Sequence, residues 1–128
     1  QARAVAEAVN TVDPALPVLG LSGSAFFAAA EELGLRTVAE AFADRSYRPD
    51  GQLVSRRERN AVLHDPDEIA ERVISMVATG RGAAVDGSMI PITVESVCVH
   101  GDSEGAVQIA TSVRKRLIAE GVDLSPFS

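Results

Sequence analysis

Several residue types and patterns are scarce or missing in this chain, and each absence narrows its function. Cys98 is the single cysteine in 128 residues, so no disulfide can form within the chain and no thiolate cluster can bind zinc. Tryptophan is absent and aromatic residues make up 4% of the sequence, so the core has to be aliphatic. No apolar run reaches the roughly 18–20 residues that span a bilayer. These features are compatible with a reducing cytoplasm, which is the location we expect.

Positive charge and nucleotide motifs are also scarce. The 12 Lys and Arg residues are outnumbered by 18 Asp and Glu residues, which gives a net charge of −6. Nucleic acid and anionic membranes attract positive charge, so we expect neither as a partner. The glycine-rich phosphate-loop patterns are missing, and His64 and His100 do not have the spacing of a helical zinc motif. The residues therefore give no basis for a metal site.

The residues that are present predict one α/β domain over residues 1–128. The hydrophobic content of 46% is sufficient for a core. Helices are predicted over residues 2–10, 25–33, 66–79 and 104–120. Strands are predicted over residues 18–21, 35–41, 83–85 and 96–99, with a turn or short hairpin at 86–91. Short connections between strand, helix and strand are typical of a parallel sheet with helices packed outside it.

A first polar cluster lies at the end of the predicted strand 35–41. It consists of Glu40, Asp44, Arg45 and Tyr47. The ends of parallel strands are where α/β sheets and barrels hold their chemistry. Arg45 could bind a substrate carboxylate through two hydrogen bonds. The alternative is an Asp44–Arg45 ion pair that only braces a loop.

A second polar cluster, His100 and Asp102, follows the predicted strand 96–99. Histidine suits general acid or base catalysis because it titrates near neutral pH. A His100 hydrogen-bonded to backbone and an Asp102 that caps the following helix are the alternatives. Because parallel strands end at one edge of a sheet, Asp44 or Arg45 should lie within about 10 Å of His100 or Asp102, the scale of a ligand pocket.

Other polar residues receive structural interpretations. His64, just before the expected helix cap at Asp65, is interpreted as a structural residue. Cys98 alternates within an apolar strand and is expected to be a small buried hydrophobe. The arginines of the loop are expected to form a solvated surface, and they are Arg56, Arg57 and Arg59.

Three ordered segments carry a resemblance to a known family. They are Glu40-Ala-Phe-Ala-Asp-Arg-Ser-Tyr47 with its continuation to Val54, Ala61-Val-Leu-His-Asp-Pro66, and Val97-Cys-Val-His-Gly-Asp102. They resemble the C-terminal part of the LamB/YcsF family, the A subunits of 5-oxoprolinase, over nearly the whole chain to about Leu124. The resemblance implies the last strand–helix units of a distorted (β/α) barrel of the glycoside hydrolase/deacetylase type. Family members begin with motifs such as Asp-Leu-Asn-Cys-Asp that this chain lacks, so we expect the N-terminal part to be absent.

The resemblance also implies an activity and partners. The family opens the lactam 5-oxo-L-proline to L-glutamate with ATP, in complex with subunits B and C. For such a reaction Asp44 or Glu40 would act as base and His100 as acid. The substrate would then be bound by Arg45, Tyr47 and Asp102. A chain without the other family motifs should be inactive alone.

Two other functions are compatible with the sequence. The chain could be a non-catalytic binding or assembly piece, or, by analogy of fold alone, part of a metal-dependent carbohydrate or amide hydrolase. Few strands also imply an open sheet, and exposed strand edges recruit other chains. We therefore expect self-association through exposed apolar residues of the strands, such as Leu19, Leu21, Val38 and Val97.

Overall fold

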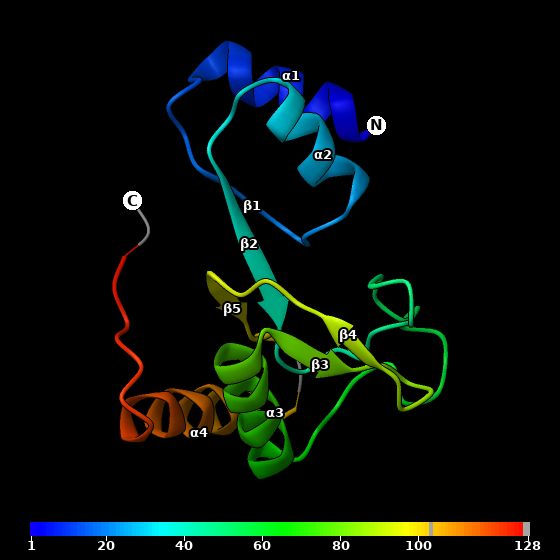
Figure 1. Ribbon diagram of the computed structural model, residues 1–128, viewed down its shortest axis with the longest axis vertical. Coiled ribbons are helices and arrows are strands. Elements are labelled where there is room, and N and C mark those ends of the chain that lie inside the picture. The colour runs from blue at the N-terminus through cyan, green and yellow to red at the C-terminus, as the bar shows by residue number, and fades with distance from the viewer. Residues whose placement is uncertain (103, 127–128) are drawn as a thin grey trace.

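The computed structural model describes residues 1–102 and 104–126, and it confirms an α/β fold with parallel strands. The helices are α1 (Ala2–Val12), α2 (Ala25–Glu32), α3 (Pro66–Thr79) and α4 (Ala106–Ala119). The strands are β1 (Val18–Gly20), β2 (Thr37–Phe42), β3 (Arg81–Ala83), β4 (Met89–Pro91) and β5 (Ser96–Cys98). Figure 1 shows α1 and α2 at one end of the molecule and α3 and α4 at the other, with β2 running between them.

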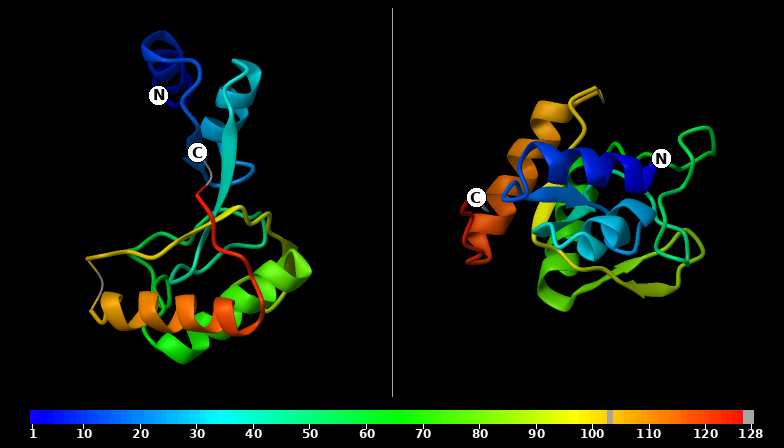
Figure 2. Two further views of the ribbon diagram at one scale, coloured as in Figure 1. Left: turned by 90° about the vertical axis from the view of Figure 1, so that its left-hand side faces the viewer. Right: turned by 90° about the horizontal axis from the view of Figure 1, so that it is seen from above.

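The main sheet has the strand order β1-β2-β5, and all its pairings are parallel. The two neighbours of β2 are staggered along it. Residues 37–39 pair with β1, and residues 40–42 pair with β5. The two ends of the molecule are therefore joined by a narrow waist at β2, which the left view of Figure 2 shows.

The remaining two strands form the predicted hairpin. Strand β3 pairs antiparallel with β4, and it begins two residues before the predicted strand at 83–85. In the turn, Asp86 Oδ1 accepts hydrogen bonds from the backbone N–H of Ser88 at 2.9 Å and from its hydroxyl at 2.6 Å. Gly87 between them has φ of 83°, a left-handed conformation that glycine adopts without strain. This local chemistry made the hairpin predictable.

The helix boundaries were predictable where a side chain caps the helix. Ser24 caps α2 through the N–H of Phe27, and Asp65 caps α3 through two N–H groups at 2.9 Å. The alternative in which Asp102 caps the last helix is wrong. Helix α4 begins at Ala106, and its cap is Gly105, which has no side chain to offer.

Three hydrophobic clusters hold these elements together. The first, beneath α1 and α2, contains Ala6, Val18, Ala29, Ala30 and Leu35. The second packs α3 against α4 and includes Ile69, Val73, Ile109, Val113 and Leu117. The third joins the hairpin to α3 and β2 around Tyr47, Met76, Ile90 and Ile92.

The strands are less exposed than expected. Val38 is 3% exposed, so the prediction of an exposed side chain is wrong there. Leu19, Leu21 and Val97 are half-buried. Val38 lies on β2, the central strand of the sheet, where it pairs with Leu19 of β1. Among the described residues, no helix has the length and apolar character needed to cross a membrane.

Candidate active site

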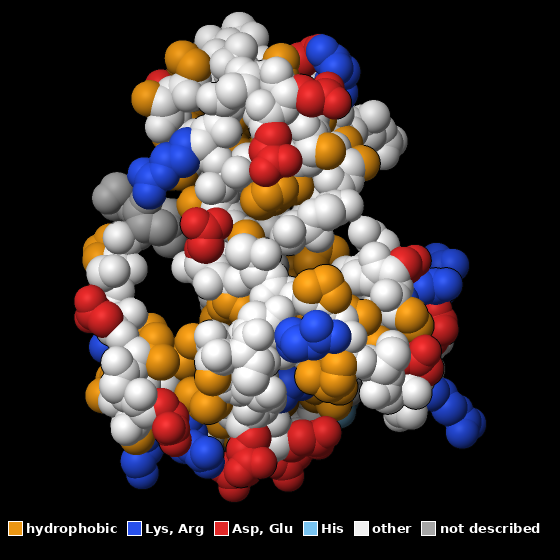
Figure 3. All heavy atoms as spheres, viewed as in Figure 1, with side chains coloured by type: hydrophobic (Ala, Val, Ile, Leu, Met, Phe, Trp, Pro, Cys, Tyr) orange, Lys and Arg blue, Asp and Glu red, His pale blue; other side chains and the backbone are white. Residues whose placement is uncertain are grey.

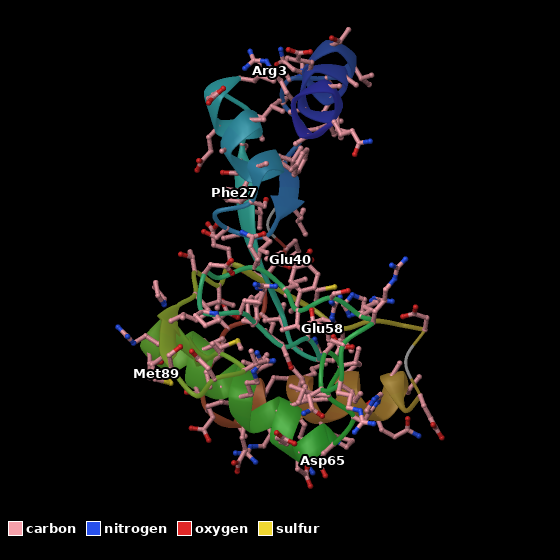
Figure 4. All side chains as sticks on the ribbon, turned by 90° about the vertical axis from the view of Figure 1, so that its right-hand side faces the viewer. Arg3, Phe27, Glu40, Glu58, Asp65 and Met89 are labelled. Carbon is pink, nitrogen blue, oxygen red and sulfur yellow. The ribbon has the colours of Figure 1, made fainter. Side chains whose placement is uncertain are left out.

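A pocket of about 410 Å³ lies beyond the carboxyl ends of β2 and β5. Its walls come from the segments after these strands and from the long loop that precedes α3. The lining residues are Asp44, Arg45, Arg56, Glu58, Asn60, Ala61, Val62, His64, His100, Asp102 and Glu104. Members of both predicted clusters are therefore found in one cavity. Figure 4 shows Glu58, which belongs to this lining, and Asp65, which lies at the distant start of α3.

The centre of the pocket is a contact between Asp44 and His100. Asp44 Oδ1 lies 2.7 Å from His100 Nδ1, which confirms the predicted approach of the two clusters. The Asp44 side chain is fully buried, whereas that of His100 is 18% exposed. Phe42 stacks on the imidazole, with ring centroids 5.8 Å apart. The hydrogen bond with Asp44 and the stacked ring of Phe42 together fix the orientation of His100.

The strand register explains why these two residues meet. Phe42 pairs with Cys98 in the parallel β2–β5 ladder, and the N–H of Ala43 extends the ladder to the Cys98 carbonyl at 2.9 Å. Asp44 and His100 each stand two residues beyond that pair. Both residues leave the sheet at the same edge, because β2 and β5 are parallel neighbours, and this common edge brings the two side chains together.

Arg45 has a mainly structural position in this arrangement. It is 7% exposed. Its Nε donates to the carbonyl of Ala61 at 3.3 Å, and its Nη2 donates to the carbonyl of Val54 at 2.6 Å. These bonds hold the two arms of the long loop against the segment after β2. Two of the donor atoms that could bind a substrate carboxylate are thus already engaged.

Tyr47 faces the core and is not among the residues that line the pocket. It is 1% exposed, and its hydroxyl oxygen accepts a hydrogen bond from the N–H of Phe42 at 2.8 Å. The guanidinium carbon of Arg72 lies 5.3 Å from the centre of the Tyr47 ring. Burial raises the pKa of Tyr47, although the hydrogen bond from Phe42 and the charge of Arg72 oppose this. Its position is that of a residue that holds the end of β2.

Glu40 lies on β2 opposite Ser96, and it too is not among the pocket-lining residues. The side chain is half-buried. Burial raises its pKa above 4.5, and the nearby positive charge that His100 can carry lowers it. Glu40 is therefore coupled to His100 through its charge. Figure 4 shows it at the waist of the molecule.

Asp102 lies at the rim of the pocket and meets a residue that the sequence did not single out. Its Oδ2 lies 3.3 Å from Nη1 of Arg56, and both side chains are exposed. The hydrogen bond from Arg56 is the main reason that the pKa of Asp102 is lowered. His64, interpreted as structural, is exposed and lines the pocket. No sequence signal could have placed Arg56 there, because 46 positions separate it from Asp102.

Neither a metal cluster nor a reactive thiol is indicated. The described residues contain no group of three or more His, Cys, Asp or Glu side chains arranged to hold a metal ion. Cys98 is half-buried rather than buried. Its pKa is raised, first by burial and then by the negative charges of Glu40 and Asp44. A raised pKa keeps the thiol protonated, which makes it a poor nucleophile.

Comparisons with known proteins agree on one family. The model of the LamB/YcsF family matches residues 1–128. The A subunit of 5-oxoprolinase from Mycolicibacterium gilvum (strain PYR-GCK) is 81% identical over 128 residues, which are 100% of this chain and 51% of that protein. The A subunit of 5-oxoprolinase from Mycobacterium marinum (strain ATCC BAA-535 / M) is 67% identical over 127 residues, 99% of this chain and 50% of that protein.

A solved structure agrees in fold. The crystal structure of the lactam utilization protein from Thermus thermophilus matches with a TM-score of 0.91 and 37% sequence identity. The match covers 98% of this chain and 50% of that one. The chain thus spans about half the length of the relatives that it matches.

Proposed function

This chain belongs to the LamB/YcsF family, and we propose that it provides the acid–base residue of an enzyme that opens the lactam ring of 5-oxo-L-proline to give L-glutamate. The names of its relatives support a 5-oxoprolinase, and the solved relative is named for lactam utilization. The observation that carries the proposal is the contact between the buried Asp44 and His100 in an open polar pocket.

In this proposal His100 is the catalytic residue and Asp44 is a positioning residue. A carboxylate only accepts hydrogen bonds, so the 2.7 Å contact places the proton of His100 on Nδ1. The other ring nitrogen, Nε2, is then the atom with a lone pair for substrate chemistry. The Asp44 side chain is fully buried and its Oδ1 contacts His100, so Asp44 acts on the substrate through His100. This arrangement replaces the expectation that Asp44 or Glu40 is the base.

The reaction is balanced with one water molecule. His100 Nε2 removes a proton from water, and the water oxygen forms a bond to the lactam carbonyl carbon. The ring C–N bond then breaks, and His100 returns the proton to the leaving nitrogen. The product carries a new carboxylate and a free amine.

ATP is the co-substrate that the family resemblance implies, but this pocket does not suit it. Four carboxylates line the pocket, from Asp44, Glu58, Asp102 and Glu104. Arg45 and Arg56 are the arginines among the lining residues, so the carboxylates outnumber them, and a triphosphate, with several negative charges, would be repelled more strongly than a single substrate carboxylate. We therefore assign no step through ATP to these residues.

We further propose that the sheet is part of a distorted (β/α) barrel and that the enzyme works with partner subunits B and C. The three-stranded parallel sheet has β1 and β5 at its edges, and helices accompany it. The relatives are named as A subunits, which supports an assembly. In barrels the reacting groups lie at the carboxyl ends of strands, where Asp44 and His100 are found.

The first prediction concerns these two residues. In the complete enzyme, with all segments and subunits required for turnover, His100→Ala should lower kcat by about 10²- to 10⁴-fold, the usual contribution of a general acid–base. Asp44→Ala should lower kcat with little change in KM, because it acts through His100. Steady-state assays with 5-oxo-L-proline measure both effects.

If Asp44 had only a structural role, its replacement would not change the tautomer of the His100 imidazole. The ¹⁵N resonances of His100 should report a proton on Nδ1 in the natural chain and a mixture of tautomers in Asp44→Ala. The matched control is Asp123→Asn, an exposed carboxylate beyond α4. Full turnover by His100→Ala in a folded enzyme would contradict the proposal.

A further inference from the structure

The charges in the pocket pose a problem for an acidic substrate. Four carboxylates line the pocket, whereas its arginines are Arg45 and Arg56. A lactam that carries its own carboxylate would be repelled unless that group met a cation. The arginine that receives the substrate carboxylate therefore decides how the ring is presented to His100.

Arg45 is poorly suited to this task. It is buried, and its Nε and Nη2 donate to the carbonyls of Ala61 and Val54. A turn of Arg45 toward the pocket would leave these buried acceptors without a donor, which is costly. The loop that forms one wall of the pocket would also lose its brace.

Arg56 has the opposite properties. Its side chain is 51% exposed, and its contact with a described side chain is the 3.3 Å bond to Asp102. Exposed ion pairs of this kind contribute little to stability, so the bond can be exchanged at small cost. The guanidinium group binds a carboxylate through two parallel N–H donors. Asp102 is itself a carboxylate, and it occupies the position on Arg56 that a substrate carboxylate would take.

We propose that Arg56 is the specificity-determining residue that binds the carboxylate of the lactam substrate and that Asp102 holds it over the pocket until the substrate arrives. The inference rests on the proposed lactam-opening function and deepens it. The substrate carboxylate displaces Asp102 from Arg56. The ring then lies between Arg56 at the rim and His100 at the base of the pocket. Selectivity for lactams with a carboxylate over plain lactams follows from this contact.

The test compares two substrates in the complete enzyme. Arg56→Gln should raise KM for 5-oxo-L-proline by roughly 10- to 100-fold, the effect of losing a hydrogen bond to a charged group. The variant should leave any turnover of 2-pyrrolidinone, which has no carboxylate, unchanged. Arg56→Lys should recover only part of the loss because Lys lacks the planar fork. Asp102→Asn removes the competing carboxylate and should not raise KM.

A matched control distinguishes the site from general surface charge. Arg57→Gln alters the next residue, which is exposed and is not among the pocket-lining residues, and it should leave KM unchanged. If the natural enzyme turns over 5-oxo-L-proline but Arg56→Gln has the same KM, only the assignment of Arg56 is overturned. If the natural enzyme neither binds nor opens 5-oxo-L-proline, the proposed function is overturned, and this inference with it.

Discussion

At the scale of single residues, Glu40 shows how burial and charge act on one carboxyl group. It is half-buried on the central strand, and burial is the largest influence on its pKa, which lies above the reference value of 4.5. A positive charge on His100 opposes this shift. A carboxyl group with a raised pKa binds its proton more tightly in the folded chain than in the unfolded chain. Its contribution to stability is therefore present below about pH 4.5 and is lost as the pH rises through the folded pKa.

The second prediction follows from this loss of the stabilising contribution of Glu40 as the pH rises. Glu40→Gln removes the ionisable group, so it should become more stable relative to the natural chain as the pH rises from 4 to 7. Urea unfolding at both pH values measures the difference in free energy of unfolding. A second measurement uses His100→Ala. The pKa of Glu40, followed by NMR, should rise further in that variant because an opposing charge has been removed. A stability difference that is equal at both pH values would contradict the prediction.

At the scale of elements, Glu95 joins β5 to the centre of β2. Its backbone N–H donates to the carbonyl of Ala39 at 2.9 Å, and its side-chain Oε2 accepts from the N–H of Ala39 at 2.8 Å. Ala39 is 2% exposed and also pairs with Gly20 of β1. Glu95 therefore extends the β2–β5 hydrogen-bond ladder by one residue before β5 begins, and the waist of the molecule depends on its side chain.

The third prediction tests this contact. Glu95→Ala leaves the N–H of the buried Ala39 without an acceptor, which should destabilise the fold by about 1–3 kcal/mol. Glu95→Gln keeps an acceptor oxygen and should cost less. Thermal or urea unfolding measures both. As a control, Glu31→Ala removes an exposed carboxylate from α2 and should change stability by no more than about 0.5 kcal/mol. Equal stability of Glu95→Ala and Glu31→Ala would show that the contact is unimportant.

At the scale of the whole molecule, the edge of β5 opens onto a groove of about 680 Å³. Its apolar lining comes from the β5 region, α4 and the chain that follows α4, and includes Val94, Val97, Val99, Val113, Leu117 and Leu124. Figure 3 shows an opening between the segment after α4 and the rest of the molecule, with hydrophobic side chains nearby. A strand edge beside an apolar groove is a surface that can accept another strand.

We predict that this chain associates with a second copy through that edge. Sedimentation velocity over a range of concentrations should show a reversible increase in mass. Val97→Lys places a charge on β5 and should weaken association, since charged side chains protect strand edges. The control is Val107→Lys, on a residue of α4 that is 77% exposed. Thermal melts check that both variants are folded, and a natural chain that stays monomeric at high concentration would contradict the prediction.

Local chemistry in the sequence determined much of the fold. Ser24 and Asp65 cap their helices through neighbouring N–H groups, and Gly80 ends α3 in a left-handed conformation with φ of 65°. The approach of Asp44 to His100 was also predictable. It follows from the common edge at which parallel strands end.

Only the tertiary structure decided which polar side chains face the pocket. The long loop folds back so that Arg45 pairs with Val62 and Tyr47 with Leu53, which turns Arg45 and Tyr47 inward. The same fold brings Arg56 to Asp102, so Asp102 holds an arginine rather than capping α4. These outcomes depend on contacts between distant parts of the chain. Spacing along a sequence fixes the local conformation, whereas the direction of a loop side chain is set by the surfaces against which the loop packs.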